Sequence, residues 1–84
     1  MAHGLVLTGY LRSVKEVEVA PKEGEKFKQQ VAVIDTGQDW LYRVVCPREQ
    51  EAAFHAALDD LVGSEVAIEV TNGEYRRLWY QGLA

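Results

Sequence analysis

The stretch DWLYRVVC, residues 39–46, combines two large aromatic side chains and a guanidinium with an apolar end. Trp40 and Tyr42 offer flat faces for a nucleobase, and base–aromatic stacking contributes about 1–3 kcal/mol per base. Arg43 is a candidate phosphate contact, because basic side chains supply the salt-dependent part of nucleic-acid affinity. The stretch is therefore suited to binding something flat and anionic. The same aromatics would also suit the core of a small protein, and for Trp40 the sequence leaves both interpretations open.

The alternation of side chains along a strand bears on this choice. In a regular strand Trp40 and Tyr42 share one face, whereas Leu41, Arg43 and Val45 share the other. Arg43 is expected to point outward, which places Trp40 and Tyr42 toward the core. Only a bulge near Leu41 would return Trp40 to the outer face beside Arg43.

Other aromatic and basic residues extend the set of candidate contacts. Lys26, Lys28 and Gln30 are alternate residues of one strand, so their side chains point to the same face. This pattern predicts a polar and basic outer face on their strand. Arg76 and Arg77 are adjacent, so their side chains point to opposite faces of the strand or lie at the rim of the barrel. The sequence allows either face of the last strand to be the buried one. The predicted nucleic-acid contacts are Tyr10, Arg12, Lys26, Lys28, Trp40, Arg43, Arg76, Arg77 and Trp79.

Other residues are expected to be structural. Phe27 and Phe54 should fill the interior, as should Tyr42 and Tyr80. Cys46 ends an apolar strand and is expected to be an inert, buried thiol. Asp35 and Asp39 flank a turn, where aspartate side chains commonly bond to the backbone.

No arrangement typical of catalysis stands out. The chain has no Gly-rich phosphate loop, nucleophile elbow or cysteine pair. His55 lies at helical spacing from Glu51 and Asp59, which could imitate a metal site, but carboxylates on a solvated helix face favour a structural role. We therefore expect a protein that is not an enzyme and uses no metal or cofactor.

Length and composition predict one globular domain spanning residues 1–84, with 48% apolar and 26% charged residues. The net charge of −4 argues against indiscriminate binding of polyanions but allows a local basic face. The single cysteine and an N-terminus without a basic region or long apolar run predict a cytoplasmic protein with no membrane partner. Small domains are often completed by a second copy, so a homodimer is expected.

The element order indicates the fold. Residues 5–19, 26–35 and 40–46 are expected to be strands, the first of them bent at Gly9. Residues 47–63 are expected to be a helix, and residues 64–71 a fourth strand. Asn72-Gly73 predicts a two-residue hairpin turn into the last strand. The helix stripe consists of Phe54, Leu58, Leu61 and Val62.

Three strands, one helix and two strands, with a long bent first strand, predict an all-β protein. This order is that of the five-stranded oligonucleotide/oligosaccharide-binding (OB) barrel, with its helix between the third and fourth strands.

The segments LVLTGYL, WLYRVV and GSEVAIEV, in this order, are similar to those of bacterial single-stranded DNA-binding proteins. The resemblance implies an OB barrel that binds single strands by aromatic stacking and a basic groove, often as a dimer or tetramer. Arg43 matches the family's strand arginine, Val44 and Val45 match its valines, and Trp40 approximately matches its stacking tryptophan.

The chain also departs from the family's pattern. The family has one residue between tryptophan and arginine, whereas this chain has Leu41 and Tyr42. Pro47 stands where the family tends to carry another aromatic. The family's long binding hairpin is expected to be reduced here to Asn72-Gly73, and its acidic tail is not expected.

These observations predict a protein that binds single-stranded DNA without strong sequence preference, by aromatic stacking and a basic strand face. The resemblance implies a setting in replication, recombination, or plasmid or phage maintenance. The alternative is an OB module for protein interaction or assembly, favoured by the acidic balance, the short hairpin and Leu41 on the ligand face. An RNA-binding or primosome-type relative lies between the two. The response to salt distinguishes nucleic-acid binding from protein association. Added salt weakens nucleic-acid binding steeply, whereas association through a strand edge should respond little.

Overall fold

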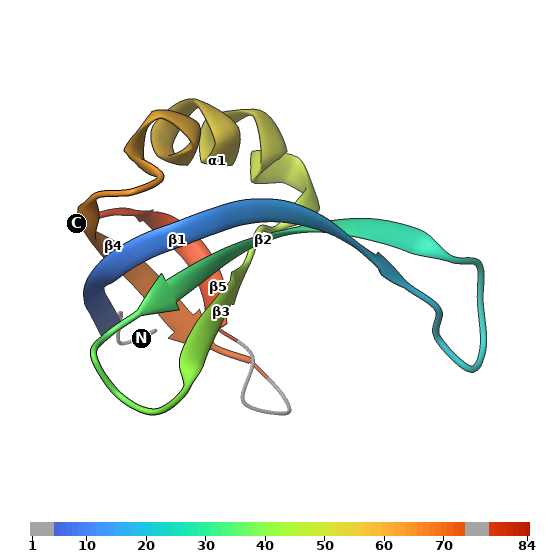
Figure 1. The fold of residues 1–84 in the computed structure, drawn as a ribbon. Coiled ribbons are helices and arrows are strands. Elements are labelled where there is room, and N and C mark those ends of the chain that lie inside the picture. Colours follow the sequence, from blue (N-terminus) through green and yellow to red (C-terminus); the bar gives the residue numbers. More distant parts are fainter. Residues whose placement is uncertain (1–4, 74–77) are drawn as a thin grey trace.

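A computed structural model describes residues 5–73 and 78–84 of the chain (Figure 1). Its strands are β1 (Leu5–Val19), β2 (Phe27–Asp35), β3 (Leu41–Val45), β4 (Glu65–Asn72) and β5 (Leu78–Leu83). Helix α1 (Glu51–Leu58) lies between β3 and β4 and is flanked by the 3-10 turns η1 (Arg48–Gln50) and η2 (Asp59–Leu61). The predicted order of strands and helix is confirmed.

The five strands form one sheet that closes into a ring in the order β1-β2-β3-β5-β4. The ring closes because the first half of β1 pairs antiparallel with β4. The seam between β3 and β5 is parallel and short, with Val44 opposite Leu78 and Val45 opposite Trp79. In Figure 1, α1 lies across one side of this ring.

Strand β1 serves two partners because it bends. Its first residues pair with β4 as far as Tyr10, which is also the first residue to pair with β2. A Cβ atom on Gly9 would lie 2.6 Å from the backbone oxygen of Asp35 and 2.8 Å from Cγ2 of Ile34. Glycine therefore allows the close approach that the bend requires, and the register shifts again between Leu11 and Ser13.

Beyond the ring, β1 and β2 continue as a two-stranded ribbon that we call the arm, residues 16–30. In Figure 1 the arm projects well away from the ring. Phe27 pairs with Val19 on this ribbon and is only half-buried, so its predicted place in the interior is wrong. The reason is that β2 begins outside the ring and pairs with β3 only from Val31 onward.

The core fills the ring and the space under α1. Phe54 and Leu58 are fully buried, and the Phe54 ring meets Tyr80 edge-on at a centroid distance of 5.0 Å. Tyr42 is half-buried against this core. Cys46 is buried as predicted, and burial raises the pKa of its thiol to about 11. The thiol therefore stays protonated and unreactive near neutral pH.

The helical segment is shorter than the sequence predicts. Pro47 is extended and precedes η1, and the last helical residue is Leu61. Val62 is extended and its side chain is 45% exposed, so its assignment to the buried stripe is wrong. Gly63 has a φ of 93°, which glycine adopts readily after a helix end.

The turn between β4 and β5 also differs from the prediction. Asn72 is the last residue of β4 and pairs with Leu78. A two-residue turn at Asn72-Gly73 is therefore excluded, because Asn72 is itself paired within the sheet. The reduction of this hairpin to Asn72-Gly73 is wrong for the same reason.

Candidate functional site

A groove of about 650 Å³ lies on the outer face of the sheet, between the arm and β3. Its floor includes Val31 and Val45, which pair with each other and are nearly buried although they point away from the core cluster. We call it the first groove. Its lining residues are Val17, Val19, Gln29, Val31, Trp40, Leu41, Tyr42, Arg43, Val45 and Leu78.

Trp40 stands at the edge of the first groove and is 55% exposed. Its ring lies edge-on to Tyr42, with the centroids 6.4 Å apart. The pairing of β2 with β3 is regular from Asp35–Leu41 to Val31–Val45, so β3 contains no bulge. Trp40 is nevertheless outside the core, because the strand begins at Leu41 and strand alternation does not reach the preceding residue. The expectation that only a bulge could expose it is wrong.

Arg43 lies two positions into β3, opposite Val33 and exposed. It is the only charged residue among the described residues that line the first groove. Within the described parts of the chain it takes part in no ion pair. The groove therefore offers an apolar floor, an exposed indole and one exposed cation.

Arg12 is held near the loop that carries Trp40. Its Nη1 lies 3.2 Å from Oδ2 of Asp35, and Oδ1 of Asp35 accepts a 2.8 Å hydrogen bond from the backbone N–H of Gly37. The predicted bond from Asp35 to the turn backbone is confirmed. The two contacts tie the register shift in β1 to loop 36–40, and so help to fix the position of Trp40.

We expect Asp35→Ala to lower the free energy of unfolding by about 1–2 kcal/mol, because one backbone hydrogen bond and one exposed ion pair are lost. Chemical denaturation measures this change. Asp39→Ala is the matched control, since Asp39 is exposed and flanks the same loop, and its effect should stay within about 0.5 kcal/mol. Equal effects of the two substitutions would contradict the role given to Asp35.

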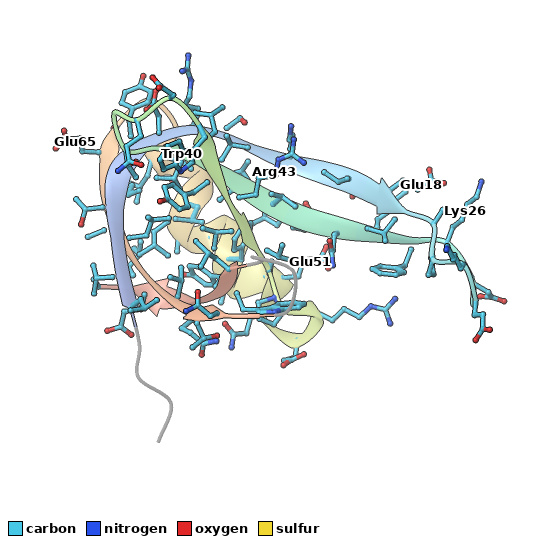
Figure 2. All side chains as sticks on the ribbon, turned by 90° about the horizontal axis from the view of Figure 1, so that it is seen from below. Glu18, Lys26, Trp40, Arg43, Glu51 and Glu65 are labelled. Atoms are coloured by element: carbon cyan, nitrogen blue, oxygen red, sulfur yellow. The ribbon has the colours of Figure 1, made fainter. Side chains whose placement is uncertain are left out.

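The lysines of the arm lie apart from the first groove. Lys26 Nζ is 3.7 Å from Glu18, and Lys28 Nζ is 3.3 Å from Glu16. Figure 2 shows Glu18 and Lys26 together near the end of the arm, away from Trp40 and Arg43. Hydrogen bonds from Gln30 and Lys28 lower the pKa of the Glu16 carboxyl, which stays ionised beside Lys28 at neutral pH.

The basic outer face predicted for β2 is wrong. Gln30 shares its parity with Ala32 and Ile34, which lie in the core cluster. The buried Gln30 amide donates to Glu16 at 3.0 Å, and its oxygen lies 3.0 Å from Nε2 of His55. His55 Nδ1 lies 2.9 Å from Asp59. These polar contacts connect the arm to α1.

The outer face of β2 carries Gln29, Val31 and Val33 instead of the lysines.

A second groove, of about 740 Å³, adjoins the first where both are lined by Gln29. Trp79 lines it and is half-buried on the outer face, because its neighbours Leu78 and Tyr80 are buried. The sequence is compatible with either orientation of Trp79. The other lining residues are Phe27, Lys28, Gln30, Cys46, Pro47, Arg48, Glu49, Glu51, Thr71 and Gln81.

The structure thus places the predicted nucleic-acid contacts in different parts of the molecule. Trp40 and Arg43 meet at the first groove, and Lys28 and Trp79 at the second. Tyr10 is exposed where β1 meets Asp35 and Glu65, outside both grooves. Arg76 and Arg77 lie outside the described residues. Phe27 and Arg48 were not predicted as contacts, because their proximity depends on how the arm meets η1.

In residues 5–73 and 78–84, no three histidine, cysteine or acidic side chains are grouped so that they could hold a metal ion. Within the described residues, no helix combines the length and the apolar character that crossing a membrane requires. Comparisons of the chain with protein-family models, curated proteins and solved structures found no match.

Proposed function

We propose that this chain is an OB-fold protein that binds single-stranded DNA in the first groove, without strong sequence preference. The order β1-β2-β3-β5-β4 and the place of α1 between β3 and β4 support the fold, because this is the connectivity of OB barrels. The resemblance of three segments to bacterial single-stranded DNA-binding proteins supports the ligand. The protein holds the strand unpaired and performs no chemistry on it.

The observation that carries the proposal is that exposed Trp40 and exposed Arg43 line one groove with an apolar floor. A base stacks on the indole, and its phosphate approaches the guanidinium. Stacking requires an accessible π-face, which a single strand offers and a duplex hides. Stacking on an aromatic face tolerates every base, so we expect little sequence preference.

The ion pairs of Arg12, Lys26 and Lys28 are compatible with a further contribution from these three side chains to DNA binding. All three pairs lie among exposed side chains, where an ion pair contributes about 0–1 kcal/mol. A phosphate can therefore replace a carboxylate partner at small cost. The overall charge of −4 opposes long-range attraction of DNA, so we expect affinity to rest mainly on stacking.

Fluorescence titration with oligo-dT at low and high salt tests the proposal. We expect quenching of tryptophan emission that weakens as salt rises, because bound phosphates release counterions. Trp40→Ala should reduce the affinity about 5-fold to 150-fold, which corresponds to about 1–3 kcal/mol of stacking. Circular dichroism verifies that the variant folds.

Trp40→Phe is the matched variant, since it retains an aromatic face at the same position and should keep most of the affinity. Absence of binding by the folded wild-type protein at low salt would overturn the proposal. Equal affinities of Trp40→Ala and wild type would remove Trp40 from the site.

Exposed apolar residues favour a second candidate, an assembly module in which copies of the chain associate. Leu5 and Val6 of β1 and Leu83 of β5 are each about half exposed, on the two strands that flank β4. Apolar burial would drive such association, and it is not weakened by moderate salt. Particle mass measured by light scattering in the same salt series distinguishes this association from DNA binding.

A further inference from the structure

The outer face of the sheet is continuous between the two grooves. Val31 pairs with Val45, Val45 lies opposite Trp79 across the parallel seam, and Trp79 lies opposite Thr71. These residues form one row across β2, β3, β5 and β4. A DNA strand that leaves the first groove past Val45 therefore reaches Trp79 along the same face of the sheet.

The second groove differs chemically from the first. Trp79 offers an aromatic face, and Gln29 and Gln81 offer carboxamides with both donors and acceptors. The Gln81 side chain donates to the Thr71 hydroxyl at 3.2 Å, which holds it beside Trp79. Such groups suit the flat face and polar edge of a nucleobase.

The charges of the second groove decide which part of a nucleotide fits there. Glu49 and Glu51 line it and repel a phosphate, and the Lys28 ammonium that also lines it lies 3.3 Å from a carboxylate oxygen of Glu16. The Arg48 guanidinium lies 5.6 Å from the centroid of the Phe27 ring, where a cation–π contact holds it. Two acidic and two basic side chains line the groove, so it offers no net attraction for a phosphate, and its aromatic and carboxamide groups favour a base.

We propose that the DNA strand held in the first groove continues into the second groove and stacks one further base on Trp79. This inference rests on the proposed function, since it extends the same strand. It assigns Trp79, Gln29 and Gln81 to a second base-binding site and predicts that affinity depends on oligonucleotide length.

Titrations with oligo-dT of about four and about twelve nucleotides test the inference, because these lengths span one or both grooves of a small OB domain. Trp79→Ala should weaken binding of the longer oligonucleotide at least about fivefold. Binding of the shorter one, which fills the first groove, should change less than twofold. Trp79→Phe keeps an aromatic face and should restore most of the lost affinity.

The outcomes separate the two proposals. If Trp40→Ala weakens both lengths and Trp79→Ala weakens neither, the second base site is overturned and the proposed function stands. If folded wild-type protein binds neither length, the proposed function fails and the inference fails with it. Unfolding midpoints of all variants, measured in the same buffer, exclude loss of the fold as the cause. If Trp79→Ala proves unfolded, Gln81→Ala replaces it, and unchanged affinity of a folded Gln81→Ala variant for the longer oligonucleotide overturns the site.

Discussion

Replacing Phe54 by alanine is expected to lower the free energy of unfolding by about 3–5 kcal/mol. Phe54 is fully buried on α1, and its ring packs edge-on against Tyr80 of β5 and the neighbouring His55. Alanine removes this apolar area from the core and leaves a cavity between the helix and the ring of strands. Because small domains are stable by only about 5–15 kcal/mol, the variant should be close to unfolding at room temperature.

Val62→Ala is the informative control for Phe54→Ala. The sequence places both residues in one helical stripe, whereas the structure exposes Val62 after the end of η2. We therefore expect Val62→Ala to change stability by no more than about 0.5 kcal/mol. Urea unfolding followed by circular dichroism measures both variants. A cost for Val62→Ala comparable to that for Phe54→Ala would show that the helix continues beyond Leu61.

Gly9→Ala is expected to cost about 1–3 kcal/mol, although it adds only a methyl group. The new Cβ would lie 2.6 Å from the backbone oxygen of Asp35, and a backbone atom cannot move aside as a flexible side chain can. The bend of β1 would open, and with it the point where β1 passes from β4 to β2. Thermal unfolding of the variant should show a melting temperature lowered by several degrees.

Thr8→Ala serves as the neighbouring control for Gly9→Ala, because Thr8 is exposed on the same strand and pairs with Ala67. Its effect should stay within about 0.5 kcal/mol. A stable Gly9→Ala variant with wild-type melting would mean that β1 and β2 do not approach as closely as the structure places them.

The elements of the fold follow from patterns within short segments. The alternation of Val66, Ile68 and Val70 places their strand correctly, and the spacing of Phe54 and Leu58 places the buried face of the helix. Gly9 was expected at a bend, and it lies where two strands approach closely. Such features depend on residues near one another in sequence, so the sequence alone is sufficient to predict them.

The candidate site depends on contacts between distant residues, and here sequence reasoning was less successful. The exposure of Trp40 follows from where the pairing of β3 with β2 begins, at Leu41 and Asp35. The half-buried position of Phe27 follows from where the ring ends along β2. The pairing of Lys28 with Glu16 follows from the register of β1 and β2. None of these registers can be read from one strand alone.

The passage of β1 from β4 to β2 has a consequence for how the chain folds. The contacts among β1, β2 and β3 join neighbouring segments, whereas Leu5 must find Val70 near the opposite end of the chain. Closing such a long loop costs chain entropy before its contacts form, and non-local strand pairing slows folding. The three-strand meander is therefore expected to form first. During synthesis, the first half of β1 stays without its partner until β4 has emerged from the ribosome.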